Sequence, residues 1–325
     1  MKKVLITGCA GFIGFHTTIK LLSENKFIVG VDNLNRYYDQ KLKLDRLKLI
    51  KKNKNSKKFV FNKIDIYNSK DLDLICKKFK FDQIIHLAAQ AGVRYSLKSP
   101  KTYTKSNIVG TFNILELAKK YNIKEIILAS SSSVYGLNKK IPFKENHSTD
   151  NPKQFYAATK KSSEIMAYSY SNLYNIKIYV LRFFTVYGPW GRPDMALFKF
   201  VENIIKGKPI ELYNFGNHSR DFSYIDNVVD FISSCSNKIQ RKKSIYEIFN
   251  VGFGKQTKLL YFLDIIEKKL KRKAKIKYLK FQKGDMKDTY ADTSKIKKFT
   301  KIKNTVKIED GIANFIAWFR NYYLR

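Results

Sequence analysis

The segment Val4–Gly14, VLITGCAGFIG, decides the fold of this 325-residue chain. The apolar run Val4–Thr7 predicts a buried strand, and it passes directly into the pattern G-x-x-G-x-x-G formed by Gly8, Gly11 and Gly14. Glycines at this spacing let the backbone turn tightly, let a pyrophosphate approach the N-terminus of the next helix, and let helix and strand pack closely. A glycine pattern alone is weak evidence, so its value depends on the residues around it.

The residues that follow the glycines provide this context. Phe12–Asn25 is amphipathic and predicts a helix, and the apolar run Ile28–Val31 predicts a second strand that leads into Asp32. An acidic side chain at this place accepts hydrogen bonds from the ribose hydroxyls of adenosine and repels a 2′-phosphate. The segment therefore predicts a dinucleotide site that prefers NAD to NADP.

Apolar runs continue to alternate with amphipathic segments through the first half of the chain. This alternation predicts an α/β fold with a Rossmann-type, doubly wound parallel sheet. The further predicted strands are Lys58–Asn62, Gln83–Leu87, Glu125–Ser130 and Lys177–Arg182, and the further predicted helices are Asp71–Phe79, Thr102–Tyr121 and Phe155–Tyr174.

The pattern changes after about Arg182, where short strands, loops and isolated helices follow. We therefore expect residues 1–182 to form the dinucleotide-binding domain. Residues 183–325 are expected to form mainly a smaller C-terminal substrate-binding lobe, with about 220–252 returning to the first domain.

The chain is strongly basic, with 63 Lys and Arg against 27 Asp and Glu and a formal net charge of +36. Such a charge keeps a non-catalytic nucleic-acid or membrane binder open as an alternative. The basic residues are spread along the chain, however: Lys51–Lys58 is typical of a solvated loop, and Lys268–Lys273 of the wet side of a helix whose other face carries leucines and isoleucine. We therefore favour a compositional bias over a specific polyanion partner.

The same sequence argues against a membrane or metal protein. It shows no leader and no apolar run of membrane-spanning length, which predicts a cytoplasmic protein without membrane insertion. Cys9, Cys76 and Cys235 are odd in number and far apart, and the histidines are scattered, so we expect neither a disulfide framework nor a metal site.

A second constellation, Tyr156 and Lys160, opens the predicted helix Phe155–Tyr174. Four residues apart on a helix, the hydroxyl and the ammonium project from the same face. A tyrosine loses its proton near pH 10, and a neighbouring ammonium together with a positive nicotinamide favours the phenolate. The pair is unremarkable alone, but downstream of a dinucleotide fingerprint it indicates an acid/base.

Hydroxyl side chains follow the predicted strand Glu125–Ser130. Ser131, Ser132 and Ser133 come at its carboxyl end, which is where ligands bind in doubly wound sheets. A serine run is more often a turn or a helix cap, so this signal is supportive rather than decisive.

Together these segments resemble the extended short-chain dehydrogenase/reductase family, within it the NAD-dependent epimerases and dehydratases of nucleotide sugars, and most closely the UDP-glucuronate 4-epimerases. The likeness covers essentially the whole chain. The segment Arg182–Ala196 discriminates best, because the UDP-glucose epimerases usually carry an Asn-containing segment there. The other matching segments are Gly8–Gly14, Asp32–Asn35 with Tyr37–Asp39, Asp65–Ile66, His86–Ser96, the serine run and Tyr156–Lys160.

The resemblance implies a role for each matching residue toward NAD. It makes Tyr156 the acid/base, Lys160 a partner of the nicotinamide ribose that lowers the tyrosine pKa, and Ser131 the partner of the sugar 4-oxygen. The cofactor-binding set it implies is Gly8, Gly11, Phe12, Ile13, Gly14, Asp32, Asn33, Asn35, Asp65, Ile66, Leu87, Ala88, Ala89, Gln90, Asn107, Ser130, Tyr156 and Lys160.

The resemblance also implies a substrate set. Arg192 is the preferred candidate for a uronate, because a guanidinium pairs with a carboxylate at two points. Arg220 and Asp285 are expected at the UDP ribose and phosphates. Arg94, Ser132, Ser133 and Thr185 are expected to line the hexose pocket, together with Ser131 and Tyr156. Apart from Lys160, Arg94, Arg192 and Arg220, we assign the basic residues to solvation.

The implied activity is NAD-dependent 4-epimerisation of UDP-glucuronate to UDP-galacturonate through a transient 4-keto sugar. Related dehydratases and decarboxylases usually carry acidic residues after the catalytic hydroxyl, where this chain has Ser132 and Ser133, so UDP-glucose epimerisation is the closest alternative. Relatives pair through two helices, which implies a homodimer formed by Thr102–Tyr121 and Phe155–Tyr174. Uronate epimerisation suggests a part in polysaccharide biosynthesis.

Overall fold

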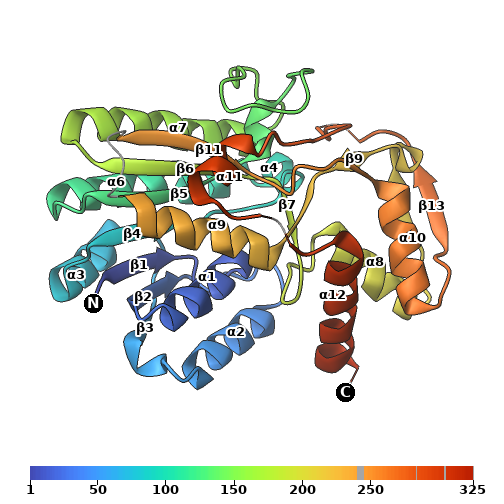
Figure 1. Ribbon diagram of the computed structural model, residues 1–325, viewed down its shortest axis with the longest axis horizontal. Helices are drawn as coiled ribbons and strands as arrows, with labels where there is room; N and C mark the ends of the chain where they lie inside the picture. The colour runs from blue at the N-terminus through green and yellow to red at the C-terminus, as the bar shows by residue number, and fades with distance from the viewer. Residues whose placement is uncertain (240–244, 283, 304, 325) are drawn as a thin grey trace.

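The computed structural model describes residues 1–239, 245–282, 284–303 and 305–324 (Figure 1). Its centre is a parallel sheet of seven strands in the order β11-β6-β5-β4-β1-β2-β3. The strands are β1 (Lys3–Thr7), β2 (Phe27–Asp32), β3 (Phe59–Lys63), β4 (Gln83–His86), β5 (Glu125–Ser131), β6 (Lys177–Phe183) and β11 (Tyr246–Val251).

Helices cover both faces of this sheet (Figure 1). One face packs on α1 (Phe12–Ser23) and α9 (Ile225–Lys238), with α2 (Gln40–Lys52) beside α1. The other face carries α3 (Ser69–Phe79), α6 (Gly110–Lys120) and α7 (Phe155–Tyr174). Because both faces are covered, the central strands are continuous apolar runs rather than alternating ones, and β4 and β5 are buried along their whole length.

The six strands predicted from the sequence are confirmed to within one or two residues, and so are the helices of α1, α3 and α7. The predicted helix Thr102–Tyr121 is more divided. Its first two residues end α5 (Pro100–Tyr103), which follows the short helix α4 (Tyr95–Lys98). The chain then passes through the π-helical segment Thr104–Val109 and continues as α6.

Helix α2 was missed, and the loop predicted for Lys51–Lys58 is wrong in its first two residues, which end this helix. The buried side of α2 carries Lys43 and Arg46 among its leucines and isoleucine, so its apolar stripe is interrupted by charges. Both cations donate hydrogen bonds, Lys43 to Asn35 and the terminal nitrogens of Arg46 to the carbonyls of Ala10 and Trp190. The expectation that the remaining basic residues only serve solvation is therefore wrong for these two.

A smaller lobe lies to the right of the sheet in Figure 1. It contains α8 (Ala196–Ile205), α10 (Leu259–Leu270) and α12 (Ile308–Tyr323), while α11 (Ser294–Thr300) packs on β11. Leu260 of α10 is exposed, contrary to its predicted place on the buried side. Short strand pairs complete the lobe: β13 (Ile276–Leu279) with β8 (Ile210–Tyr213), β10 (Phe222–Tyr224) with β7 (Thr185–Tyr187), and β12 (Thr257–Lys258) with β9 (Ser219–Arg220).

The direction of strand order reverses between β1 and β4. In doubly wound sheets a crevice opens outside the carboxyl ends of the strands at such a point, and ligands bind there. Thr7 of β1 and His86 of β4 end at this place, and the glycine turn follows directly after β1. Within the described part of the chain, no helix combines the length and the apolar character that a bilayer span requires.

Candidate functional site

A cavity of about 1250 Å³ lies at this reversal, between the carboxyl ends of the strands and the smaller lobe. Its volume exceeds the range typical of a single drug-sized ligand, and so leaves room for a dinucleotide together with a second ligand. The predicted residues that line it are Gly8, Gly11, Phe12, Ile13, Gly14, Asp32, Asn33, Asn35, Asp65, Ile66, Leu87, Ala88, Ala89, Gln90, Arg94, Ser130, Ser131, Ser132, Ser133, Tyr156, Lys160, Thr185, Arg192, Arg220 and Asp285.

The glycine turn has no room for side chains. Gly8 has a φ of +74°, and a Cβ there would lie 2.8 Å from the backbone nitrogen of Ala88. A Cβ at Gly14 would lie 2.0 Å from the carbonyl oxygen of Gly8. Helix α1 then begins without a side-chain cap and without an acidic residue in its first turn, which leaves its N–H groups available to an anion at the cavity wall. This cradle fits the pyrophosphate of a dinucleotide.

The predicted adenosine side is a hydrogen-bonded corner beyond β2. The buried Asp32 carboxylate accepts the backbone N–H groups of Ala10, at 3.2 Å, and Leu34, at 2.8 Å. Asn33 donates to Asp65 at 3.0 Å, which ties the ends of β2 and β3 together. Burial raises the pKa of Asp32, while Lys43 opposes this rise. Asp32 thus holds the glycine turn in place as well as lining the cavity.

Asn107 is the predicted cofactor residue that does not line the cavity. Its side chain is buried and accepts the N–H of Gln90 at 2.8 Å, while its amide donates to the carbonyl of Gln90 and to the Thr159 hydroxyl. Asn107 therefore joins the loop after β4 to helix α7 and acts on the site by positioning Gln90.

Lys160 is buried in the cavity wall one helical turn after Tyr156. No residue in the described part of the chain accepts a hydrogen bond from its Nζ. Burial lowers the pKa of this ammonium to about 8, and only Glu164 acts in the opposite direction. A buried amine without a partner is costly, so this atom fits a ligand hydroxyl such as those of a nicotinamide ribose.

Tyr156 is half-buried, and its desolvation raises its pKa. A hydrogen bond with Ser131 and the positive charge of Arg192 oppose the rise. The sequence predicted that Lys160 would supply this charge, whereas in the structure the cation acting on Tyr156 is Arg192. A protonated phenol in an apolar environment next to a serine hydroxyl has the arrangement of a general acid/base.

The serine run divides into two kinds of side chain. The Ser130 hydroxyl donates a hydrogen bond to the Glu164 carboxylate at 2.5 Å, so this hydroxyl is already used within the protein. Ser131 caps a short 3₁₀ turn, accepting the N–H of Ser133 and donating to its hydroxyl, each at 3.2 Å. Ser131, Ser132 and Ser133 all line the cavity.

The four charged residues predicted for the substrate, Arg94, Arg192, Arg220 and Asp285, all have polar partners within the protein. Arg94 forms an ion pair with Asp285 at 3.1 Å and lies over the ring of Tyr213. Arg220 donates to the carbonyls of Ser219, Met286 and Lys287 and so holds the segment that carries Asp285. Arg192 pairs with Asp194.

Sequence reasoning gave no role to three residues that line the same cavity, Tyr37, Lys43 and Asp194. Tyr37 and Asp194 stand inside quoted motifs, but their mutual contact joins residues far apart in the chain. Lys43 is hidden in a lysine-rich helix, where composition offers no signal that separates it from the solvated lysines.

His86 is buried beside the site without being a candidate for proton transfer. Its Nδ1 lies 2.7 Å from the Thr7 hydroxyl, and burial lowers its pKa to about 3, so the ring is neutral. In the described ranges there is no group of three or more His, Cys, Asp or Glu side chains that could hold a metal ion.

Comparison with known proteins places this site in a family. The family model described as GDP-mannose 4,6 dehydratase matches residues 5–315. A UDP-glucuronate 4-epimerase of Thermodesulfobacterium geofontis is 44% identical over 320 residues, which cover 98% of this chain and 96% of that protein.

Solved structures agree with this placement. The UDP-glucuronic acid 4-epimerase of Bacillus cereus in complex with UDP-glucuronic acid and NAD superimposes with a TM-score of 0.90 at 33% identity, covering 99% of this chain and 100% of that one. A UDP-glucose 4-epimerase of Thermotoga maritima with UDP-glucose gives a TM-score of 0.87 at 28% identity, covering 98% and 99%. The chain therefore belongs to the family of NAD-dependent nucleotide-sugar epimerases and dehydratases.

Proposed function

We propose that this protein is an NAD-dependent UDP-glucuronate 4-epimerase that interconverts UDP-glucuronate and UDP-galacturonate. The observation that carries the proposal is the placement of Tyr156, Lys160 and Ser131 in one cavity with the glycine turn and with Arg192. The first four elements provide a dinucleotide and acid/base site, and the arginine provides a cation for a uronate. The relatives with UDP-glucuronate in their names support the same substrate.

Tyr156 is the residue that moves the proton. It takes the proton from the C4 hydroxyl, with Ser131 hydrogen-bonded to the same oxygen, and returns it after the sugar has turned. NAD⁺, when bound, supplies the hydride chemistry at C4, accepting a hydride and giving it back without net redox change. Lys160 binds the ribose hydroxyls of the cofactor, while the positive charge of Arg192 lowers the cost of deprotonating Tyr156.

The two walls of the cavity have different tasks in this proposal. The UDP part is held by the smaller lobe through Arg220 and the segment with Asp285, which the hydrogen bonds of Arg220 fix near the cavity. The hexose lies among small side chains, Ser132, Ser133 and Thr185, which leave space for a 4-keto sugar to rotate. A firmly held diphosphate and a loosely packed sugar allow either face of C4 to meet the hydride.

A homodimer through α6 and α7 is part of the proposal. These helices expose large apolar side chains away from the sheet, namely Phe112, Ile165, Tyr168 and Leu173, and such side chains in groups are typical of protein interfaces. A cytoplasmic location and a part in polysaccharide biosynthesis are consistent with a UDP-uronate substrate and are proposed on that ground alone.

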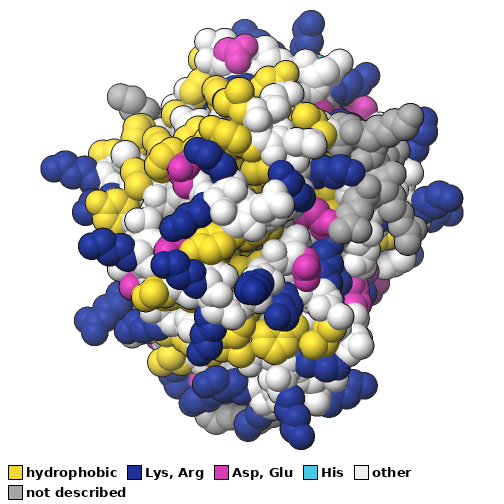
Figure 2. All heavy atoms as spheres, turned by 90° about the vertical axis from the view of Figure 1, so that its left-hand side faces the viewer, with side chains coloured by type: hydrophobic (Ala, Val, Ile, Leu, Met, Phe, Trp, Pro, Cys, Tyr) yellow, Lys and Arg dark blue, Asp and Glu magenta, His cyan; other side chains and the backbone are white. Residues whose placement is uncertain are grey.

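The distribution of charge weakens the alternative of a polyanion binder. Figure 2 shows Lys and Arg side chains dispersed over one face, with apolar and neutral atoms between them rather than a continuous basic stripe. A nucleic-acid interface is expected to gather its basic residues along one track. The charge is better suited to attracting a substrate that carries a diphosphate and a carboxylate.

A panel of UDP-sugars with product analysis tests the proposal. The purified protein is expected to contain bound NAD and to convert UDP-glucuronate to UDP-galacturonate without added cofactor. Tyr156→Phe is expected to lose this activity while keeping its NAD, because the ring still fills the site but has no proton to exchange. Conversion of UDP-glucose but not of UDP-glucuronate would show that the proposed substrate is wrong. Nucleic-acid binding that weakens steeply with salt, without turnover of any UDP-sugar, would show that the proposed function is wrong.

A further inference from the structure

The carboxylate of Asp194, in the same loop, fixes Arg192 side-on, through the edge of the guanidinium that Nε and Nη2 form. Arg192 Nε donates to Asp194 Oδ1 at 2.9 Å, and Arg192 Nη2 donates to Oδ2 of the same carboxylate. The pair stands between β7 and α8, and both residues line the main cavity. Burial acts to lower the pKa of Arg192, but the charge and the hydrogen bond of Asp194, together with Tyr37 and Tyr38, raise that pKa overall. The guanidinium is therefore a fixed and permanently charged group.

A guanidinium has two edges that can each grip a carboxylate at two points. Asp194 takes the edge formed by Nε and Nη2. The other edge, formed by Nη1 and Nη2, remains, and Nη1 has no hydrogen-bond partner in the described ranges. Because Arg192 lines the cavity, this second edge is available to a ligand there.

Asp194 is itself fixed from the cofactor side of the cavity. The Tyr37 hydroxyl donates to Asp194 Oδ2 at 3.2 Å, and Tyr37 belongs to the loop that follows Asp32. Gly92 makes room for that hydroxyl, because a Cβ at this position would lie 2.3 Å from the Tyr37 oxygen. Tyr103 in turn donates to the carbonyl of Ala91, which secures the turn.

This arrangement matters because a free arginine side chain would have to be ordered when substrate binds. Both Lys and Arg lose rotamer entropy on immobilisation, and a planar fork that is already oriented loses less for each hydrogen bond. A neutral hexose leaves the second edge without an acceptor, whereas a uronate fills it. Sites built for a polar group discriminate strongly against analogues that lack it.

We propose that Asp194, supported by Tyr37, is a positioning residue that fixes Arg192 side-on and presents its second edge to the C5 carboxylate of a uronate. The unit that sets the preference for UDP-uronates over neutral UDP-hexoses is then the three residues together. This inference rests on the proposed function, in which Arg192 binds the uronate.

The test compares steady-state kinetics with UDP-glucuronate and UDP-glucose for the holoenzyme and for Asp194→Asn, Tyr37→Phe and Arg192→Met. Asp194→Asn is expected to raise KM for UDP-glucuronate about tenfold, the effect of losing one well-placed polar contact, with kcat changed by less than about twofold. Tyr37→Phe is expected to act in the same direction by about threefold, because one weaker hydrogen bond is lost. Neither variant is expected to change KM for UDP-glucose by more than about twofold.

Asp230→Asn is the matched control, because Asp230 forms an exposed ion pair with Lys20 on the far side of α1. It is expected to leave both substrates unaffected. Bound NAD and the melting temperature are measured for every variant, and if Asp194→Asn does not fold, Tyr37→Phe decides the matter alone.

The outcomes separate the inference from the function on which it rests. If Arg192→Met removes the preference for UDP-glucuronate but Asp194→Asn and Tyr37→Phe do not reduce it, or if they tighten UDP-glucuronate, the inference is wrong and the function stands. An equal increase in KM for UDP-glucuronate and for UDP-glucose also contradicts the inference and leaves the function standing. If the parent enzyme does not prefer UDP-glucuronate, or if Arg192→Met leaves the preference unchanged, the proposed function and this inference fall together.

Discussion

Glu164 and Arg182 form a two-point ion pair in the interior, with 2.9 Å from Nε to Oε1 and 2.8 Å from Nη2 to Oε2. The side chains are 3% and 2% exposed. Ser130 donates to the same carboxylate, and Arg182 also donates to the Tyr135 hydroxyl at 3.1 Å. Because Glu164 follows Lys160 by one turn of α7, the pair fixes the catalytic helix to β5 and β6.

We expect Glu164→Gln to destabilise the protein by about 3 kcal/mol, because it leaves a buried guanidinium without its counter-ion. The free energy of unfolding in urea measures this loss. Glu202→Gln removes the acidic partner of Lys206 from a far more exposed pair on α8 and is expected to cost less than about 0.5 kcal/mol. If Glu164→Gln and Glu202→Gln lower the free energy of unfolding by similar amounts, burial of the Glu164–Arg182 pair does not increase its contribution to stability.

The glycine turn predicts a sharp difference between two alanine substitutions. Gly14→Ala is expected to abolish NAD binding and to lower the melting temperature strongly, because the new Cβ would lie 2.0 Å from the Gly8 carbonyl oxygen and would push apart the turn that receives the pyrophosphate. The NAD content of the purified protein, read from its absorbance after release, and a thermal melt measure both effects.

Gly207→Ala is the control for that variant. Gly207 has a φ of +65°, but nothing lies within 4 Å of a Cβ built there. Its cost is therefore limited to backbone strain of about 1 kcal/mol, with NAD content unchanged. A Gly14→Ala protein that retains full NAD would refute the assignment of this turn to the pyrophosphate.

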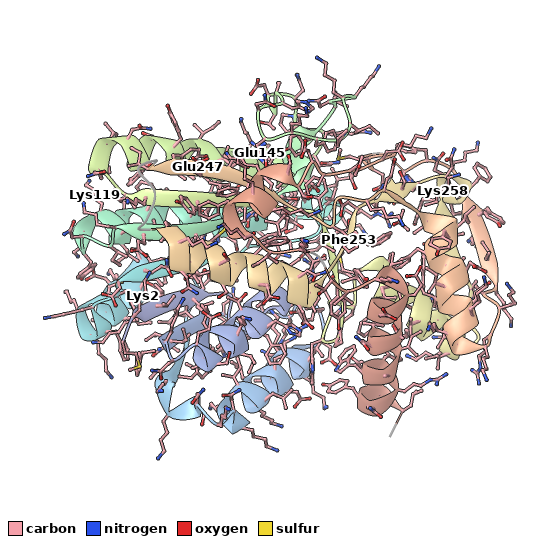
Figure 3. All side chains as sticks on the ribbon, viewed as in Figure 1. Lys2, Lys119, Glu145, Glu247, Phe253 and Lys258 are labelled. Carbon is pink, nitrogen blue, oxygen red and sulfur yellow. The ribbon has the colours of Figure 1, made fainter. Side chains whose placement is uncertain are left out.

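Asp221 is expected to be a clamp between the sheet and the smaller lobe. Its carboxylate, with no exposed surface, accepts the N–H groups of Phe253 at 2.7 Å, Gly254 at 3.0 Å and Ala291 at 3.2 Å. Phe253 lies where the two parts of the molecule meet (Figure 3). Asp221→Asn is expected to destabilise the protein by about 2 kcal/mol, because the amide NH₂ would face backbone donors instead of accepting from them.

Thermal unfolding measures this change. Asp264→Asn, which alters an exposed pair with Lys268, is the matched control and should leave the melting temperature almost unchanged. If both variants melt with the parent protein, the carboxylate is not required to hold these backbone segments together.

Most of the fold could be predicted because it depends on local patterns. The strands of the sheet are apolar runs, and the spacing of Gly8, Gly11 and Gly14 indicates the turn because these glycines stand between an apolar run and an amphipathic segment. Helix α2 could not be predicted in this way, since Arg46 and Lys43 are buried within it and their acceptors lie on other segments.

The candidate site, like the fold, could be predicted only where local sequence patterns mark its residues. Tyr156, Lys160 and Ser131 stand in recognisable motifs, and the structure places all three in one cavity. The contact of Tyr37 with Asp194 and the use of the Ser130 hydroxyl by Glu164 depend on tertiary packing, which no spacing in the sequence encodes. Asn107 illustrates the converse, because the family resemblance implies a cofactor role for it but its side chain is hydrogen-bonded to Gln90 and Thr159.

A pH dependence of stability is expected from Lys160. Burial lowers the pKa of this ammonium in the folded protein from 10.5 to about 8, so the charged form destabilises the cofactor-free fold. At 1.36 kcal/mol for each pKa unit, the penalty amounts to about 3 kcal/mol. It is present in full below pH 8 and is relieved as the pH rises from about 8 to 10.5, because the folded protein then releases a proton that the unfolded chain still holds.

Lys160→Met, which keeps the length of the side chain without its charge, is therefore expected to make the cofactor-free protein more stable than its parent by about 3 kcal/mol at pH 7. The gain should disappear toward pH 10.5, and epimerase activity should be lost. Urea unfolding of NAD-stripped protein at a series of pH values measures the gain. Lys160→Arg stays charged throughout and should show no such gain. If Lys160→Met is less stable than its parent at pH 7, or if its gain in stability does not change between pH 7 and 10.5, the buried ammonium of Lys160 does not destabilise the fold.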